Sequence, residues 1–166
     1  MLGDDLAIVG FRERLEALPG QFVFVKTARN ETKPYSVASN EEGGLEILVR
    51  AVGPASRALS EVQPGTVLRL RGPYGKPFAL PPDAEVVFVG AGCGIAPILR
   101  AAQGHPGPRR FALGTRSVEA TAFLERLHER GPVVHATEDG SSGLSGVALD
   151  ALGTLLERYP PREDVV

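Results

Sequence analysis

One stretch decides the fold: Glu85-Val86-Val87-Phe88-Val89-Gly90-Ala91-Gly92-Cys93-Gly94-Ile95-Ala96-Pro97-Ile98-Leu99-Arg100. It opens with an apolar, β-branched run that is typical of a strand buried on both faces. Gly90, Gly92 and Gly94 follow at alternate positions, and a helical segment opens at Pro97, where a missing N–H is tolerated. A helix N-terminus after such a turn presents free N–H groups and a positive dipole end to an anion. We interpret this stretch as a pyrophosphate cradle.

The glycine spacing departs from the common dinucleotide fingerprint Gly-x-Gly-x-x-Gly. Counted from Gly92, the third position is Pro97, which gives Gly-x-Gly-x-x-Pro. The missing third glycine argues against the usual close helix–strand packing of a dehydrogenase. The alternative is a structural turn between strand and helix that binds nothing, so the rest of the chain has to decide.

Composition indicates a globular protein of one ordinary domain or two small ones. The chain has 166 residues, 43% hydrophobic and 23% charged, with a net charge of −2, which gives no argument for nucleic acid or an acidic membrane. No apolar run approaches the ~20 residues of a membrane span, and no charged-then-apolar leader begins the chain. We therefore expect a cytoplasmic protein.

Metal and disulfide chemistry find little support in the sequence. Cys93 is the only cysteine, so it cannot form an internal disulfide or supply the thiolates of an iron–sulfur cluster. The three histidines, His105, His128 and His135, have no metal-like spacing, and no metal site is predicted.

The first half of the chain predicts β-structure. Short strand-forming runs alternate with turns, which favours a small barrel or sandwich. The expected strands are 21–25, 35–39, 45–52 and 66–72, and a short helical turn is expected over 56–62 with Ser56 as its N-cap.

After the prolines Pro77, Pro81 and Pro82 the pattern changes to alternating strands and helices, which favours a doubly wound parallel sheet. Further strands are expected at 111–114 and 132–137, and helices at 120–130 and 147–158. The prediction is two domains, an antiparallel β-barrel at 1–80 and an α/β doubly wound parallel sheet at 84–166.

Several motifs follow one another in a recognisable order. They are Pro19-Gly20-Gln21-Phe22-Val23, Lys33-Pro34-Tyr35-Ser36, Leu48-Val49-Arg50, Ala55-Ser56 after Gly53, Gly72-Pro73-Tyr74-Gly75, Gly90 to Pro97, and Gly114-Thr115-Arg116-Ser117. This order resembles the ferredoxin-reductase family of flavoproteins, and within it the electron-transfer subunits of two-subunit dihydroorotate dehydrogenases. The resemblance spans about residues 19–150. It implies a FAD-binding barrel followed by a Rossmann-like domain for NAD(P)H.

The resemblance implies a flavin site in the first half. Lys33 would neutralise a diphosphate, Tyr35 would lie against the flavin or its ribityl chain, and the Ser36 hydroxyl would hydrogen-bond near the reactive flavin nitrogen, as the catalytic residue. Ser56 would offer N–H and hydroxyl groups to phosphate. The remaining predicted flavin contacts are Pro34, Leu48, Val49, Arg50 and Ala55.

The nicotinamide nucleotide would lie over the second half. The predicted contacts are Gly90, Gly92, Cys93, Gly94, Pro97, Arg116 and Asp139. Three alternatives stay open: Cys93 as a small buried hydrophobe, Arg116 as a solvated side chain after a strand, and Asp139 as a turn former.

The chain also departs from the family pattern. Lys33 stands where the family has arginine, the first barrel strand and the last strand of the second domain are expected to be missing, and no cysteine cluster follows. The leading interpretation is an oxidoreductase that passes electrons from NAD(P)H through FAD to a partner protein or a small acceptor. The alternative is a non-catalytic module that binds a nucleotide or a partner. A homodimer and a hetero-oligomer both stay open.

Overall fold

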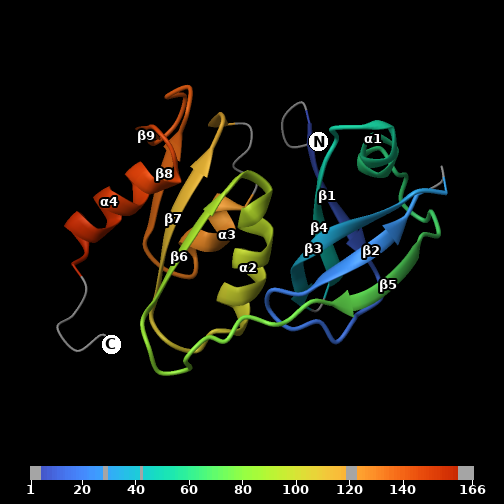
Figure 1. Cartoon of the computed structure of the whole chain (residues 1–166), viewed down its shortest axis with the longest axis horizontal. Coiled ribbons are helices and arrows are strands. Elements are labelled where there is room, and N and C mark those ends of the chain that lie inside the picture. Colours follow the sequence, from blue (N-terminus) through green and yellow to red (C-terminus); the bar gives the residue numbers. More distant parts are fainter. Residues whose placement is uncertain (1–4, 28–29, 42, 119–122, 161–166) are drawn as a thin grey trace.

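A computed structural model describes residues 5–27, 30–41, 43–118 and 123–160. Two β-sheets lie side by side, each with its own helices (Figure 1). A segment of the chain with little regular structure, between Gly75 and Glu85, joins the two halves. The two halves correspond to the two predicted domains in their order along the chain.

The first half is an antiparallel sheet of five strands in the order β1-β4-β3-β2-β5. The strands are β1 (Leu6–Phe11), β2 (Phe22–Lys26), β3 (Thr32–Glu41), β4 (Gly44–Arg50) and β5 (Arg69–Tyr74). The sheet curls around a core that contains Val23, Val25, Val37 and Ile47, each fully buried. The described residues of the edge strands β1 and β5 do not pair with one another, so the sheet is barrel-like but not closed.

The second half is a parallel sheet in the order β6-β7-β8-β9. Its strands are β6 (Val86–Ala91), β7 (Arg109–Thr115), β8 (Val133–Thr137) and the short β9 (Leu144–Ser145). Helices α2 (Ile95–Gly104) and α3 (Leu124–His128) share one buried cluster with Phe88 and Phe111, whereas α4 (Ala148–Arg158) packs on the opposite face against Ala112 and Val134. The predicted doubly wound α/β sheet is confirmed.

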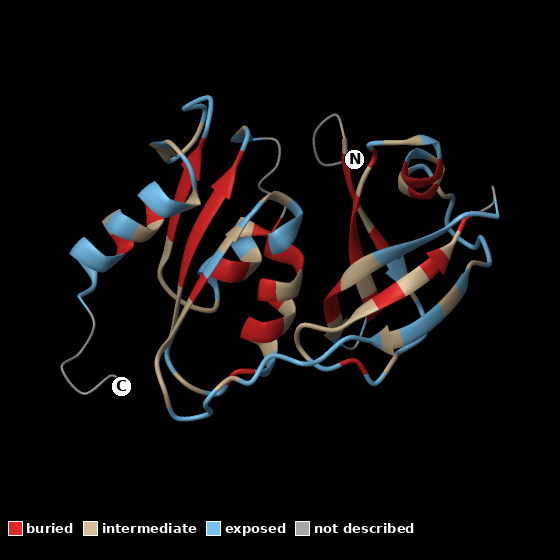
Figure 2. Ribbon diagram, in the orientation of Figure 1, coloured by how far each residue is buried: buried red, intermediate tan, exposed pale blue. Residues whose placement is uncertain are grey.

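One of the hydrophobic clusters is shared by the two halves. Ala38 of β3 and Leu48 of β4 belong to the same buried cluster as Ile95, Ala96 and Leu99 of α2. Figure 2 shows the largely buried helix α2 between the parallel sheet and the antiparallel sheet. Because apolar contact of this kind is costly to open, α2 fixes how the two sheets face each other.

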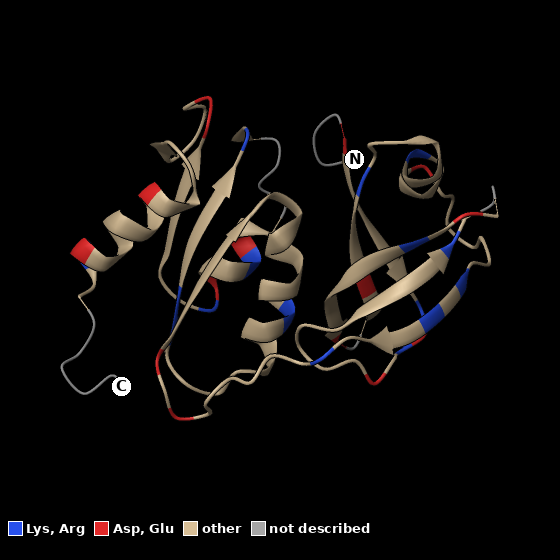
Figure 3. Cartoon of the chain, in the orientation of Figure 1, with Lys and Arg blue, Asp and Glu red and all other residues tan. Residues whose placement is uncertain are grey.

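Polar contacts reinforce this junction. Arg100 of α2 donates from Nη2 to the carbonyl oxygen of Ala17 at 2.8 Å, and Arg126 of α3 forms an ion pair with Glu46 of β4 at 2.7 Å. The Gln103 amide donates to the Ser39 hydroxyl at 3.0 Å. Elsewhere positive and negative side chains are interspersed over both halves (Figure 3), in keeping with the small net charge.

Two local expectations are corrected, and one strand was not predicted. The unpredicted strand is β1, which lies before the first predicted strand in an apolar run with the residue types of a strand. Helix α1 (Pro54–Ser60) has Gly53 as its N-cap, so Ser56 is the third helical residue and not the cap. Helix α2 begins at Ile95, two residues before Pro97, after a 3-10 turn η1 (Gly92–Gly94).

Other expectations fall partly outside the description. The predicted helix at 120–130 begins within residues 119–122, which are not among the described residues. Helix α3 covers 124–128 of this predicted helix. Within the described part of the chain, no helix is both long and apolar enough to cross a bilayer. The domain limits 1–80 and 84–166, the two missing strands and a cytoplasmic location stay predictions.

We predict that Leu99→Ala lowers the free energy of unfolding by about 3 kcal/mol, because Leu99 is fully buried in the shared core. Unfolding in urea, followed by far-ultraviolet circular dichroism and by tyrosine fluorescence, should give coincident transitions, since one core unfolds as a unit. The matched control is Leu149→Ala, at a side chain that is 70% exposed, which should change stability by less than about 0.5 kcal/mol. Two separate transitions in the native protein would contradict a shared core.

We further predict opposite effects for alanine at two glycines. A Cβ on Gly114 would lie 2.5 Å from the backbone nitrogen of Ala148, so Gly114→Ala should cost about 2 kcal/mol of stability. Gly153 in α4 has open space around the same position, so Gly153→Ala should stabilise by about 0.5–1 kcal/mol. Thermal unfolding of the two variants measures both, and equal shifts would refute the close packing of α4 on β7.

Candidate functional site

A cavity of about 480 Å³ lies at the junction of the two halves. Fourteen residues line it, from β3 and the residue before it, β4, the loop between β4 and α1, α1, the turn after β6 and the start of α2. They are Glu31, Lys33, Pro34, Tyr35, Ser36, Leu48, Arg50, Val52, Gly53, Pro54, Ala55, Ser56, Cys93 and Ala96. The predicted flavin residues, with one exception, are therefore gathered at one place.

The exception is Val49, which follows from the geometry of a strand. Successive side chains of β4 point to opposite faces, so Leu48 and Arg50 face the cavity while Val49 faces the barrel core, where it is fully buried. The Val49 side chain packs inside the barrel, so a contact of Val49 with a cofactor would come from its backbone, and this contact stays a prediction.

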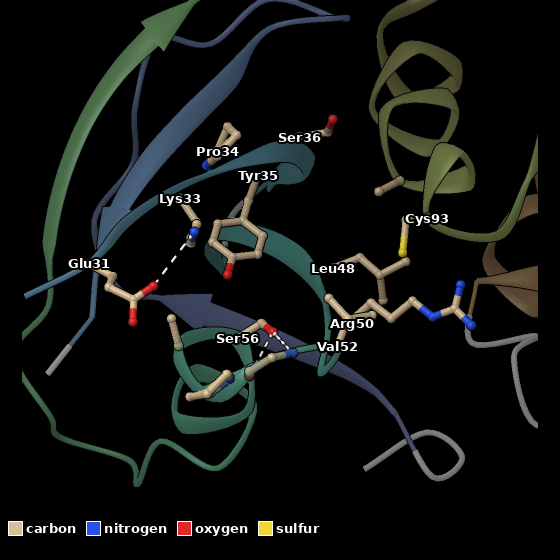
Figure 4. Close-up of a pocket in the computed structure, with 14 residues that line it drawn as sticks. Glu31, Lys33, Pro34, Tyr35, Ser36, Leu48, Arg50, Val52, Ser56 and Cys93 are labelled. Atoms are coloured by element: carbon tan, nitrogen blue, oxygen red, sulfur yellow. Dashed lines mark hydrogen bonds and ion pairs between the residues drawn. The ribbon is translucent and has the colours of Figure 1, made fainter. Parts of the chain in front are cut away.

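One end of the cavity carries charge and hydrogen-bonding groups. The ammonium group of Lys33 lies 3.6 Å from a carboxylate oxygen of Glu31, and both side chains are about half exposed. Nearby, the Ser56 hydroxyl accepts the Gly53 N–H at 3.0 Å and donates to the Gly53 carbonyl oxygen at 3.1 Å. Ser36 lies toward the other end of the cavity, on the side of α2 (Figure 4).

The Tyr35 hydroxyl is a buried polar group without a hydrogen-bond partner among the described residues. Its ring lies inside the cavity with the hydroxyl turned toward Ser56 (Figure 4). Among the described residues this oxygen is buried and has no hydrogen-bond partner, and burial raises the pKa of Tyr35. An unpaired buried hydroxyl is costly, so this orphaned oxygen fits a ligand that supplies a polar atom at this point.

Arg50 is held at the border between the two halves. Its Nε donates to Asp5 at 2.7 Å, and this hydrogen bond raises the pKa of Arg50. Figure 4 shows the guanidinium group extending past Cys93, away from the Lys33 end. The hydrocarbon part of Arg50 lines the cavity while its charge lies beside the glycine-rich turn.

The glycine-rich turn meets the same cavity through Cys93 and Ala96. Cys93 is a free, exposed cysteine, and partial burial raises the pKa of its thiol, an effect that the nearby Arg50 opposes. The protonated thiol is therefore the favoured form at neutral pH. The exposed position of Cys93 contradicts the alternative that this residue is a small buried hydrophobe.

The glycines of this turn differ in their surroundings. A Cβ on Gly90 would lie 2.3 Å from the terminal methyl of Ile98, the far end of a flexible side chain, and 3.4 Å from the Gly94 carbonyl oxygen. Gly92 has φ of +50°, the left-handed region that favours glycine. A side chain at Gly90 therefore requires only that the Ile98 methyl move, whereas Gly92 holds a backbone conformation that other residues rarely adopt.

The other predicted nucleotide residues lie outside this cavity: Gly90, Gly92, Gly94, Pro97, Arg116 and Asp139. Asp139 forms a turn, because its Oδ1 accepts the N–H of Ser141 at 3.0 Å and the Ser141 hydroxyl at 2.6 Å, and these bonds lower the pKa of Asp139. The Asp139 N–H donates to the Arg116 carbonyl oxygen at 3.2 Å, which joins the ends of β7 and β8. Contact of these six predicted residues with a nucleotide stays a prediction.

Sequence reasoning missed several lining residues. Glu31, Val52, Pro54 and Ala96 line the cavity beside the predicted motifs. Glu31 stands two residues before Lys33 on the approach to β3, a spacing that places both on one face of an extended strand. This alternation of side chains along the strand was the sequence signal that could have predicted Glu31 as a lining residue.

Comparison with known proteins agrees with this arrangement. Residues 5–78 match the family described as oxidoreductase FAD-binding domain. The chain is 34% identical over 143 residues to a protein of Pyrococcus abyssi named probable dihydroorotate dehydrogenase B (NAD(+)), electron transfer subunit, covering 86% of this chain and 56% of that protein. It is 35% identical over 147 residues to a Thermotoga maritima homolog of that subunit, covering 84% of this chain and 52% of the relative.

Solved structures share the fold. The structure of an NADH-dependent reduced ferredoxin-NADP oxidoreductase superposes with a TM-score of 0.85 at 24% identity, covering 99% of this chain and 62% of that one. The ferredoxin reductase of carbazole 1,9a-dioxygenase gives a TM-score of 0.75 at 23% identity, covering 96% and 55%. This chain spans only about half to two thirds of the length of the relatives that it matches. The predicted resemblance to ferredoxin-reductase-like proteins is confirmed.

We predict that Tyr35→Phe leaves the protein without ligand at least as stable as the native protein, with a gain of up to about 1 kcal/mol, because the change removes an unpaired buried hydroxyl. Urea unfolding measures the difference. The control is Thr115→Val, which removes a buried hydroxyl that lies 2.8 Å from Nε2 of His135 and should destabilise. A clear loss of stability in Tyr35→Phe would show that the hydroxyl is already satisfied.

Proposed function

Because this chain has the two-domain fold of the ferredoxin-reductase-like flavoproteins and carries an oxidoreductase FAD-binding domain at residues 5–78, we propose that it is a flavin-dependent electron-transfer protein. It binds FAD in the cavity between its two halves, receives electrons from NAD(P)H and passes them to a partner protein or a small acceptor. The observation that carries the proposal is the gathering of Lys33, Tyr35, Ser36 and Ser56 around one cavity.

The residues divide the cavity into two ends. Lys33 at the rim supplies a positive charge for a phosphate group, and the unpaired Tyr35 hydroxyl offers a hydrogen bond. Ser36, toward α2, offers a hydroxyl to the ring of the flavin. Leu48, Val52 and Ala96 supply the apolar wall against which a flat ring can pack. FAD supplies the redox chemistry, and these side chains hold and orient it.

The nucleotide would bind at the carboxyl edge of the parallel sheet, where open α/β sheets bind ligands. Cys93 and Ala96 belong both to the glycine-rich region and to the cavity wall, so a nucleotide on this turn would adjoin the flavin cavity. Arg50, whose charge lies beside the turn, is a cation available to such a nucleotide. This proximity supports a direct transfer between the two cofactors.

The names of the relatives suggest the partner. They are called electron transfer subunits, which supports the proposal that this chain also delivers electrons to a separate protein.

The deciding experiment mixes purified protein with FAD and records the absorption spectrum, and then adds NADH or NADPH under argon. We expect a bound flavin spectrum that is bleached by one of the two nucleotides. Bound flavin without bleaching would support the alternative, a nucleotide-binding module that does not turn over. A protein that takes up no FAD would refute the proposal.

We predict that Ser36→Ala slows flavin reduction about tenfold, the effect of losing one hydrogen bond of roughly 1.4 kcal/mol to the reacting ring. Stopped-flow absorbance measures the rate. The control is Ser60→Ala, at a hydroxyl that donates to the Arg57 carbonyl oxygen and lies outside the cavity. An unchanged rate in Ser36→Ala, with FAD bound, would remove Ser36 from the reaction.

A further inference from the structure

The charged end of the cavity carries an acidic residue beside its cation. Of the side chains that line the cavity, Lys33 and Arg50 are positive and Glu31 is negative. Arg50 is bonded to Asp5, which does not line the cavity, whereas the partner of Lys33 is the lining residue Glu31. A phosphate that approaches Lys33 therefore meets a carboxylate at the same point.

We propose that Glu31 is an affinity-determining residue, which opposes the binding of phosphate-bearing flavins and so keeps the flavin dissociable. The inference rests on the proposed flavin site. Glu31 neutralises part of the positive charge of Lys33 and repels the phosphate directly. A phosphate has to share the Lys33 ammonium with the Glu31 carboxylate or displace it.

The backbone of Glu31 is held in place, which keeps its side chain at the cavity. The N–H of Thr27 donates to the Glu31 carbonyl oxygen at 2.8 Å, and the Thr27 hydroxyl approaches the same oxygen at 3.3 Å. Strand β3 then starts at Thr32 and places Lys33 opposite Val25 of β2. Because both backbone positions are fixed, the carboxylate and the ammonium stay on the same rim of the cavity (Figure 4).

The exposure of the two side chains sets the size of the effect. Lys33 is 53% and Glu31 46% exposed, so water and salt screen their charges. Removing the Glu31 charge should therefore strengthen phosphate binding severalfold, and the gain should shrink at high salt. Riboflavin has no phosphate, so its affinity should not depend on Glu31.

The test compares Glu31→Gln with the native chain in equilibrium titrations of FAD, FMN and riboflavin, followed by flavin fluorescence at low ionic strength. We expect Kd for FAD and FMN to fall about threefold and Kd for riboflavin to stay unchanged. The matched control is Glu157→Gln on α4, which makes the same change of net charge away from the cavity. In 0.5 M salt the gain should largely vanish.

A double-mutant cycle with Lys33→Met assigns the effect to the pair. Lys33→Met should weaken FAD binding more in the Glu31→Gln background than in the native chain, because the freed ammonium contributes more. Urea unfolding without flavin checks that each variant is folded, and Glu31→Ala serves as the second variant if Glu31→Gln is not.

The outcomes separate this inference from the proposed function. No binding of any flavin by the native chain would refute the flavin site itself. Flavin binding with an unchanged FAD affinity in Glu31→Gln, or with an equal gain for riboflavin, would overturn only the role of Glu31. Additive effects of the two substitutions would overturn the sharing of the Lys33 ammonium between the Glu31 carboxylate and the phosphate.

Discussion

Helix α2 is the constraint on which the rest of the structure depends. Its apolar residues pack on one side against Phe88 of the parallel sheet and on the other against Ala38 and Leu48 of the antiparallel sheet. Burying such side chains stabilises the fold by about 25 cal/mol per Å² of apolar surface. The helix therefore makes one body of two sheets, and the cavity between them has fixed walls.

The cavity follows from this packing and from the alternation of side chains along the strands. Strand β4 gives Leu48 and Arg50 to the cavity and Val49 to the barrel core, while the start of β3 brings Lys33 and Tyr35 to its rim and interior. The N-terminal end of α2 contributes Ala96 directly beside these residues. A ligand bound here touches both halves, so its affinity depends on a junction that is already closed before it arrives. That is preorganisation, which lowers the cost of binding.

Much of this could be predicted from the sequence, because the decisive signals are local. The run before Gly90 has the composition of a buried strand, and the strand–helix alternation after Asp83 indicates a doubly wound sheet. Motif order then brought Lys33, Tyr35, Ser36 and Ser56 together correctly. The residue types did not indicate that the Val49 side chain packs in the barrel core, or that helix α1 begins before Ser56, whose hydroxyl bonds to Gly53 from within the helix. The Glu31–Lys33 ion pair was missed because a pattern of residue types gives no distances between charges.

Cys93 gives this architecture an intrinsic reporter. It is the one thiol of the chain, it is exposed, and it stands on the wall where the two halves meet. A thiol-specific fluorophore would therefore label a single, known position without any substitution. Its labelling rate would follow the occupancy of the crevice, since a molecule seated there would shield the sulfur from the reagent.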